Sequence, residues 1–159
     1  MAREIKAVLI ALVVALSLVA PVAAGPLEDG MTAFDRGDYA EAVKWYRKAA
    51  DQGLAEAQFT LGVMYHDGLG ESQDDAEALK WFRKGADQGD APAQINLGLK
   101  YHEGRGVPQD YVQAHMWFNL AASRLPPGED RDMVVGNRDS VAARMTPAQV
   151  AEAQRLARE

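Results

Sequence analysis

Apolar and small residues recur along the chain at helical spacing. Ala57, Leu61 and Tyr65 are four residues apart, which places them on one face of a helix spanning roughly 54–67. A similar stripe follows on a second helix, roughly 74–87, and consists of Ala78, Trp81, Phe82 and Gly85. The pattern therefore predicts a pair of amphipathic helices.

This pair belongs to an internal repeat. The stretch "AVKWYRKAADQGLAEAQ" begins at Ala42 and "ALKWFRKGADQGDAPAQ" begins at Ala78, and 12 of their 17 paired positions are identical. Trp45, Trp81 and Trp117 keep the same step of 36 residues. A fixed period of this length is typical of a solenoid, in which each unit buries its apolar face against its neighbours.

Capping residues mark the helix ends. Three aspartates are each followed three residues later by Glu or Gln, which is the spacing of a capping box. These pairs are Asp38 and Glu41, Asp74 and Glu77, and Asp110 and Gln113. Gly53 and Gly89 stand where a left-handed helix stop is expected. Gly62 and Gly98 recur within helices, and we interpret them as points where two helices approach closely.

The two ends of the chain depart from the repeat. The first unit has a loop shorter by four residues, and the pattern stops after "LPPG" at 125–128. A final helix is predicted from Thr146 as N-cap, with Pro147 at its first position and Gln149 closing the box. We predict an N-terminal unit at 25–53, repeats at 54–89 and 90–125, and a C-terminal helical cap at 126–159.

Residues 1–24 have the pattern of a secretory signal peptide. A short basic start precedes the apolar run Ala7–Ala20, and Val22 and Ala24 occupy the −3 and −1 positions of a cleavage site. The alternative is a retained membrane anchor, but a run of 14 residues is shorter than the roughly 20 that span a bilayer. We expect cleavage and a periplasmic or secreted protein with no membrane span.

Charge and cysteine content narrow the possible functions. Loss of Arg3, Glu4 and Lys6 with the signal peptide changes the formal charge from −6 to −7, which disfavours nucleic acid as a partner. The chain contains no cysteine, so it has no disulfide, thiolate nucleophile or cysteine-ligated metal. The fold must therefore be stabilised by packing.

The repeated phrases resemble the Sel-one-like repeat (SLR) family, a branch of the tetratricopeptide-like superfamily. The matching segments are "AQFTLGVMYHDGLG…DDAEALKWFRKGADQG" and "AQINLGLKYHEGRGVPQDYVQAHMWFNLAA", and the resemblance covers about residues 38–124. It implies an all-α right-handed solenoid of antiparallel helix pairs that binds proteins or peptides and is seldom catalytic. A cysteine-rich branch of the family is linked to penicillin binding, but this chain lacks its cysteines.

Few residues indicate chemistry. His66 and His102 occupy equivalent repeat positions, each followed by an acid, and are open to interpretation as metal ligands or as acid–base groups. We favour a structural role at helix C-termini, because histidines on adjacent units are too far apart to share a metal. His115 is expected to pack, and the basic triplets Lys44/Arg47/Lys48 and Lys80/Arg83/Lys84 are expected to form a solvated face. We predict no catalytic residue, metal or cofactor.

A binding surface is the better functional candidate. The register of tetratricopeptide-like stacks places the first helix of each pair on the concave side, and six residues then face the groove. These are Phe59, Val63, His66, Ile95, Leu99 and His102. Such a groove suits an amphipathic helix or an extended peptide. Phe59 and Ile95 are equally compatible with burial between neighbouring helices.

The sequence therefore predicts an exported, monomeric, non-catalytic adaptor that binds a protein or peptide partner. The alternatives are a peptidoglycan-related ligand-binding or enzyme-like role in the cell envelope, and a self-associating structural module. The amphipathic C-terminal segment "VAEAQRLARE" is a further candidate to occupy the groove itself.

Overall fold

The computed structural model describes residues 25–159, which form eight α-helices and contain no strand. The predicted signal peptide lies outside the described residues. The helices are α1 (Pro26–Asp35), α2 (Tyr39–Asp51), α3 (Ala55–Asp67), α4 (Asp75–Asp87), α5 (Ala91–Glu103), α6 (Tyr111–Arg124), α7 (Glu129–Ala142) and α8 (Pro147–Leu156).

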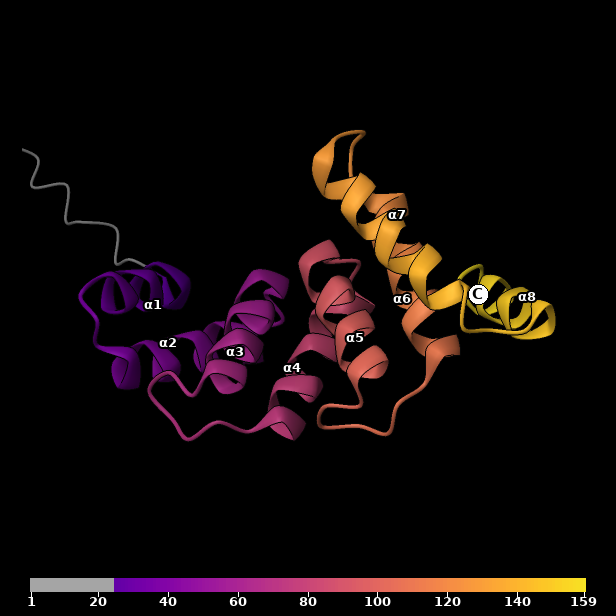
Figure 1. Cartoon of the computed structure of the whole chain (residues 1–159). Helices are drawn as coiled ribbons and strands as arrows, with labels where there is room; N and C mark the ends of the chain where they lie inside the picture. The colour runs from indigo at the N-terminus through magenta and orange to yellow at the C-terminus, as the bar shows by residue number, and fades with distance from the viewer. Residues whose placement is uncertain (1–24) are drawn as a thin grey trace, which may run out of the picture.

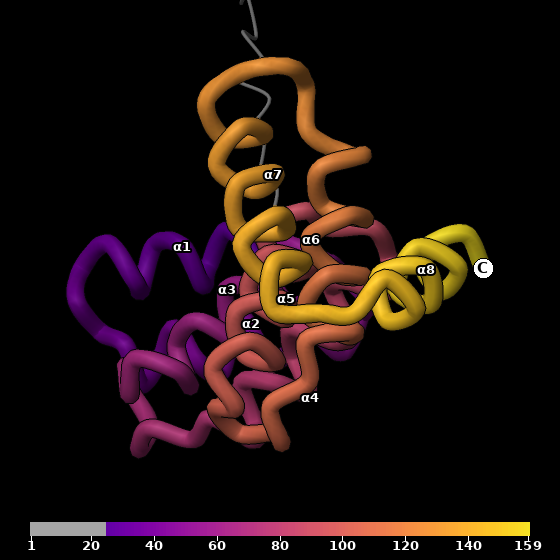
Figure 2. Tube along the Cα trace, turned by 45° about the vertical axis from the view of Figure 1, so that its right-hand side comes forward, coloured from indigo at the N-terminus to yellow at the C-terminus, as the bar shows by residue number. Residues whose placement is uncertain are grey.

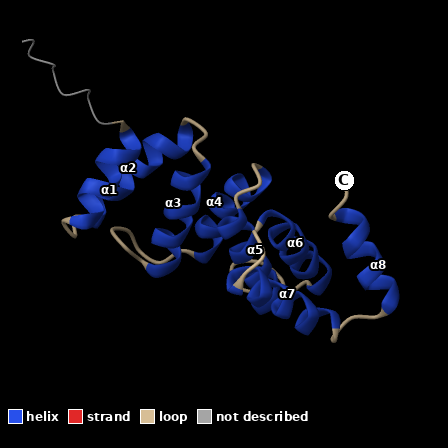
Figure 3. Ribbon diagram, turned by 90° about the horizontal axis from the view of Figure 1, so that it is seen from above, coloured by secondary structure: helices blue, strands red, loops and turns tan. Residues whose placement is uncertain are grey.

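The helices form a row in which sequence neighbours pack together (Figure 1). α1 packs on α2, α3 on α4 and α5 on α6, and these hairpins contact one another through α2 and α3 and through α4 and α5. The regularity ends at α6, because both α7 and α8 pack against it. Figure 2 shows α7 running alongside α6, and Figure 3 shows the helices from above. The predicted all-α helical-repeat solenoid is confirmed.

The predicted N-caps are confirmed. The carboxylates of Asp38, Asp74 and Asp110 each accept the backbone N–H three residues later, at 3.1, 2.9 and 3.0 Å. Each cap of this kind contributes about 1 kcal/mol to helix stability. The reciprocal bond of a full capping box is formed at α8, between Thr146 and Gln149. At α4 the Glu77 side chain instead accepts from the Trp81 indole at 3.1 Å.

The mid-helix glycines are contact points, as predicted. A Cβ on Gly62 would lie 2.6 Å from the ring of Phe82, and a Cβ on Gly98 would lie 2.6 Å from the ring of Phe118. Both rings are fully buried. The first helix of each repeat therefore needs glycine at this position, because its backbone rests on the phenylalanine of the second helix.

The core consists of two apolar clusters. The larger runs through the repeats from Ala33 on α1 to Trp117 on α6 and includes Ala153 on α8. The smaller joins α6 to α7 through Phe118, Val134 and Val141. The C-terminal helices are therefore packed onto the last repeat. None of the helices within residues 25–159 is both long and apolar enough to cross a bilayer.

The basic triplets are only partly solvated, which corrects the sequence interpretation. Lys44 and Lys80 are exposed and pair with acids one turn away, as expected. Arg47 and Arg83 are half-buried and reach the next repeat, where their guanidinium groups donate to the hydroxyls of Tyr65 and Tyr101. The repeats are therefore joined by polar as well as apolar contacts, because each arginine lies on the second helix of its own pair and reaches the first helix of the next pair.

Candidate functional site

The four apolar residues of the predicted groove are all half-buried. On α3, Phe59 and Val63 pack against the larger core cluster, and the ring of Phe59 lies 6.0 Å from that of Phe82. On α5, Ile95 and Leu99 pack against the smaller cluster. Each side chain therefore supports the core and also presents part of its surface to solvent. Their role in binding a partner stays a prediction.

His66 is held in an ionic cluster that the sequence did not suggest. Its Nδ1 lies 2.8 Å from Oδ1 of Asp75, the first residue of α4, and 2.7 Å from Nζ of Lys100 on α5. Arg105 approaches the other oxygen of Asp75 at 3.3 Å. A single ring nitrogen cannot serve both neighbours, because a protonated Nδ1 donates to Asp75 and an unprotonated Nδ1 accepts from Lys100.

Comparison of the repeats shows how this cluster arises. Lys100 occupies the position of the buried Met64, 36 residues earlier, and its own side chain is only 4% exposed. Asp75 occupies the position held by Tyr39 and Tyr111 in the flanking units. One apolar position and one aromatic position of the repeat are thus occupied by a cation and an anion that contact each other. That paired departure from the repeat is the sequence signal that could have revealed the contact.

The environment of Asp75 strongly favours its charged form. Partial burial raises the pKa of the carboxyl, but hydrogen bonds from Lys100 and His66 and the charges of Lys100 and Arg105 outweigh it and lower the pKa to about 2. Asp75 is therefore ionised throughout the physiological range. It fixes the orientation of His66 beside Val63 on α3.

His102 has a different environment from His66 despite its equivalent position. Its ring lies 5.8 Å from that of Tyr111, the first residue of α6, in place of an acid. Its Nδ1 is buried and has no hydrogen-bond partner within the described part of the chain. The two histidines are thus related by the repeat, but the ring of His66 is held by a hydrogen bond within a charged cluster and the ring of His102 by packing against Tyr111.

His115 is buried on α6, with 3% of its surface exposed. Burial lowers the pKa of its imidazole, the charge of Arg138 lowers it further, and Asp139 acts in the opposite direction. This environment fits the packing role expected from the sequence. Residues 25–159 contain no group of three or more His, Asp or Glu side chains arranged to hold a metal ion.

The C-terminal helix packs against α6. Ala153 on α8 is fully buried there, and Leu156 and Ala157 cover the same cluster. Figures 1 and 3 both show α8 at the end of the row farthest from α1, with α4, α5 and α6 between it and α3. The C-terminal segment therefore covers the last repeat and does not lie over Phe59 and Val63.

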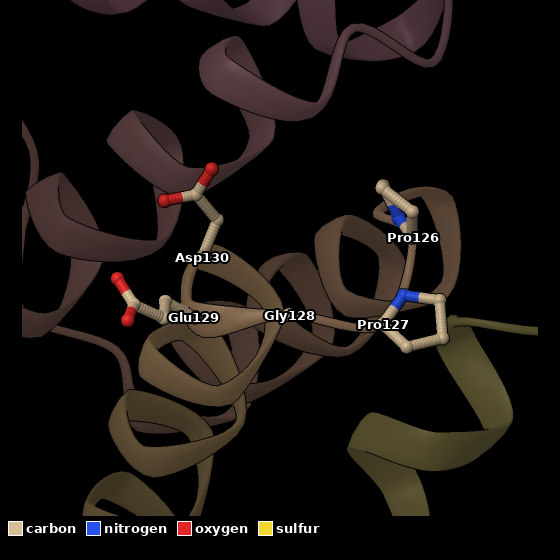
Figure 4. Close-up of a pocket in the computed structure, with 5 residues that line it drawn as sticks. All are labelled: Pro126, Pro127, Gly128, Glu129 and Asp130. Carbon is tan, nitrogen blue, oxygen red and sulfur yellow. The ribbon is translucent and has the colours of Figure 1, made fainter.

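A shallow hollow of about 340 Å³ lies at the turn between α6 and α7. It is formed by Pro126, Pro127, Gly128, Glu129 and Asp130, all of them exposed. Figure 4 shows the two carboxylates on one side of the turn and the two proline rings on the other. Glu129 and Asp130 lie in the first turn of α7, where carboxylates interact favourably with the helix N-terminus. Their role in starting the helix accounts for the acids in this hollow.

Several solved structures resemble the chain, and two of them carry Sel1-like repeats. A protective antigen present in uropathogenic Escherichia coli strains, which displays an SLR fold, is 35% identical with a TM-score of 0.74. The match covers 83% of this chain and 28% of the antigen. A Sel1 repeat protein from Oxalobacter formigenes is 33% identical with a TM-score of 0.59, covering 64% of this chain and 40% of that one. This chain therefore matches less than half the length of either protein.

No curated protein sequence matches the chain. The Sel1 repeat family model matches three consecutive segments, at residues 28–54, 55–90 and 91–124. These segments correspond to α1 with α2, α3 with α4, and α5 with α6. The three helical hairpins, their glycine contacts and this match together show that the chain belongs to the Sel1 repeat family.

Proposed function

We propose that the protein is an exported, monomeric, non-catalytic adaptor that binds a protein or peptide along its first-helix faces. Sel1 repeats usually mediate protein interactions, which is the general role of the fold. The specific proposal is that the groove lies along α3 and α5. One observation carries it: equivalent half-buried apolar residues repeat on these two helices, each set followed by a histidine.

The arrangement is suited to recognising an extended or helical peptide. Val63 and Leu99 present partly exposed apolar surface one repeat apart, which suits apolar side chains at regular intervals along a partner. His66 adds a polar group whose orientation is fixed by Asp75. Because these side chains already pack against the core clusters, we expect binding to require little further ordering of them.

The test is a crosslinking capture from the cell-envelope fraction. The wild-type protein is compared with Val63→Asp/Leu99→Asp and with Met31→Asp/Met133→Asp, which places the same charges on exposed residues outside the groove. We expect a discrete partner with wild type and with the control, and its loss with the groove variant. The milder pair Val63→Ala/Leu99→Ala, with circular dichroism, separates lost binding from lost folding.

If a folded groove variant recovered as much partner as wild type, the proposal that the partner binds along α3 and α5 would be wrong. Export is tested separately by N-terminal sequencing of the protein recovered from the envelope fraction. A mature N-terminus at Gly25 supports signal cleavage, and an N-terminus at Met1 contradicts it. Sedimentation at rising concentration tests the monomer, because self-association would increase the sedimentation coefficient.

A further inference from the structure

Gln58 has both ends of its carboxamide satisfied within the protein. Its Nε2 donates to the carbonyl oxygen of Ala50 at 3.0 Å, and its Oε1 accepts from Nε2 of Gln88 at 2.7 Å. The side chain is 5% exposed. Gln58 therefore joins the end of one repeat to the end of the next through two hydrogen bonds, of which the one to Ala50 is buried and the one from Gln88 is partly buried.

Gln94 occupies the same position one repeat later but is only half satisfied. Its Nε2 donates to the carbonyl oxygen of Ala86 at 3.1 Å, which fixes the other atom of the carboxamide as the oxygen. That Oε1 is buried and has no hydrogen-bond partner anywhere in residues 25–159. The residue is only 2% exposed, so the unpaired acceptor is costly.

The missing donor follows from a change in the repeat. The sequence "DQG" that ends the second repeat, at 87–89, becomes "SRL" at 123–125. Arg124 thus stands where Gln88 stands one repeat earlier. Its guanidinium lies against Gly89, where an added Cβ would be 3.2 Å from Arg124 Cζ, and it forms no hydrogen bond with Gln94.

Gln94 and Arg124 both line a hollow of about 420 Å³ between the α4–α5 turn, α6 and Glu159. Trp117 and Leu120 contribute apolar walls, and Asp87 contributes a carboxylate. This volume is within the range of small-molecule sites. The hollow therefore combines an unpaired buried acceptor, a cation that donates, and an apolar wall.

We propose that this hollow binds a neutral amide group of a peptide, whose N–H donates to Gln94 Oε1 and whose carbonyl accepts from Arg124. The preceding repeat shows which group satisfies this acceptor. There the equivalent oxygen, Oε1 of Gln58, accepts a hydrogen bond from the carboxamide of Gln88. A neutral amide fits better than an ion. A cation would meet Arg124, and an anion would meet Asp87 and Glu159.

The amide can come from an Asn or Gln side chain or from a peptide main chain, since both carry the same donor and acceptor. The site is separate from the proposed groove, because none of the six groove residues lines it. The proposal of an amide site therefore does not depend on the proposed groove. The Val63→Asp/Leu99→Asp variant is expected to keep it intact.

The test is an NMR titration of the ¹⁵N-labelled protein with N-acetyl-glutamine methylamide, observing the side-chain carboxamide of Gln94 and the indole of Trp117. N-acetyl-methionine methylamide, which has only main-chain amides, is the second probe. We expect saturable shifts with the first. A similar response to the second identifies a main-chain amide as sufficient, and its absence identifies the side-chain carboxamide.

Arg124→Gln is the decisive variant, because it restores the residue found at position 88. The new carboxamide is expected to donate to Gln94 Oε1, raise the unfolding midpoint and weaken probe binding about fivefold or more, as one hydrogen bond allows. Arg124→Lys keeps the charge without supplying that amide and is expected to retain binding. Gln88→Arg is expected to lower the midpoint and to create a second responsive carboxamide at Gln58.

Two results would overturn the proposal. One is the absence of any saturable shift at Gln94 in the wild-type protein with either probe. The other is equal probe affinity in wild type and Arg124→Gln, which would show that the Gln94 acceptor does not take part in binding.

Discussion

Lys100 on α5 forms a nearly buried ion pair with Asp75, the first residue of α4. The contact joins two successive repeats, and it replaces the buried methionine and the tyrosines found at the equivalent positions. Because the Lys100 side chain is only 4% exposed, the charge of its ammonium group needs an anionic partner in the folded state.

Removal of the anion should be strongly destabilising. Asp75→Asn leaves the Lys100 ammonium buried beside only a neutral amide and His66, and we expect a loss of about 3 kcal/mol in the free energy of unfolding. Urea denaturation measures it. Glu41→Gln, which breaks the exposed pair with Lys44, is the matched control and should cost about 0.5 kcal/mol or less.

Replacement of both charges should be tolerated. The double variant Asp75→Tyr/Lys100→Met reproduces the residue types of the neighbouring repeats, so no unpaired charge remains. We expect a free energy of unfolding within about 1 kcal/mol of wild type or above it. A double variant as unstable as Asp75→Asn would show that the surrounding packing, and not the charge, sets the requirement.

The Asp75 contribution should depend on pH. The folded-state pKa of about 2 is below the ordinary value of 3.8, so the unfolded chain binds this proton more readily. Asp75 therefore stabilises the fold above about pH 5, and this contribution is lost as pH falls towards 2. Urea denaturation at pH 6, 4 and 3 should show wild type and Asp75→Asn converging. A difference in the free energy of unfolding between the two proteins that stayed constant with pH would contradict the lowered pKa of Asp75.

His115 should make stability fall in a different pH range. Burial lowers the pKa of its imidazole from the ordinary 6.5, so the unfolded chain takes up this proton first on acidification. We expect stability to decrease between about pH 7 and 5, and His115→Leu to reduce that slope. The same slope of stability against pH in wild type and variant would contradict the lowered pKa of His115.

Gly62 should not tolerate a methyl group. Gly62→Ala places a Cβ 2.6 Å from the Phe82 ring, and the resulting shift of α3 against α4 should cost about 2 kcal/mol. Gly136→Ala on α7 is the matched control, because an added Cβ there meets nothing within 4 Å. That control should gain up to about 1 kcal/mol through helix propensity. Thermal unfolding distinguishes the two.

Much of the fold was predictable from the sequence. The period of 36 residues, the aspartate N-caps and the mid-helix glycines each follow from local rules, and each has the predicted role in the structure. The candidate site was harder to predict from the sequence. The half-burial of Phe59 and Ile95 was left open by the pattern, because a solenoid helix packs on two sides.

The polar contacts between repeats were not predicted. Arg47 and Arg83 were expected on a solvated face, and Lys100 was not singled out, although each contacts a residue of a neighbouring unit. Such contacts join residues 18 to 34 positions apart in sequence. Helical periodicity places a residue on a face, but it does not specify which side chain of the next unit meets it.

The sequence by itself determined the helical units, their boundaries and their stacking, because capping, glycine and apolar periodicity act within a few residues. The tertiary structure decided which departures from the repeat compensate one another. Met64 becoming Lys100 is balanced by an aspartate at position 75, whereas Gln88 becoming Arg124 leaves the Gln94 oxygen without a donor in the described chain. Buried charge and buried hydrogen-bonding capacity must be satisfied in three dimensions, and only the packed repeats show where that occurs.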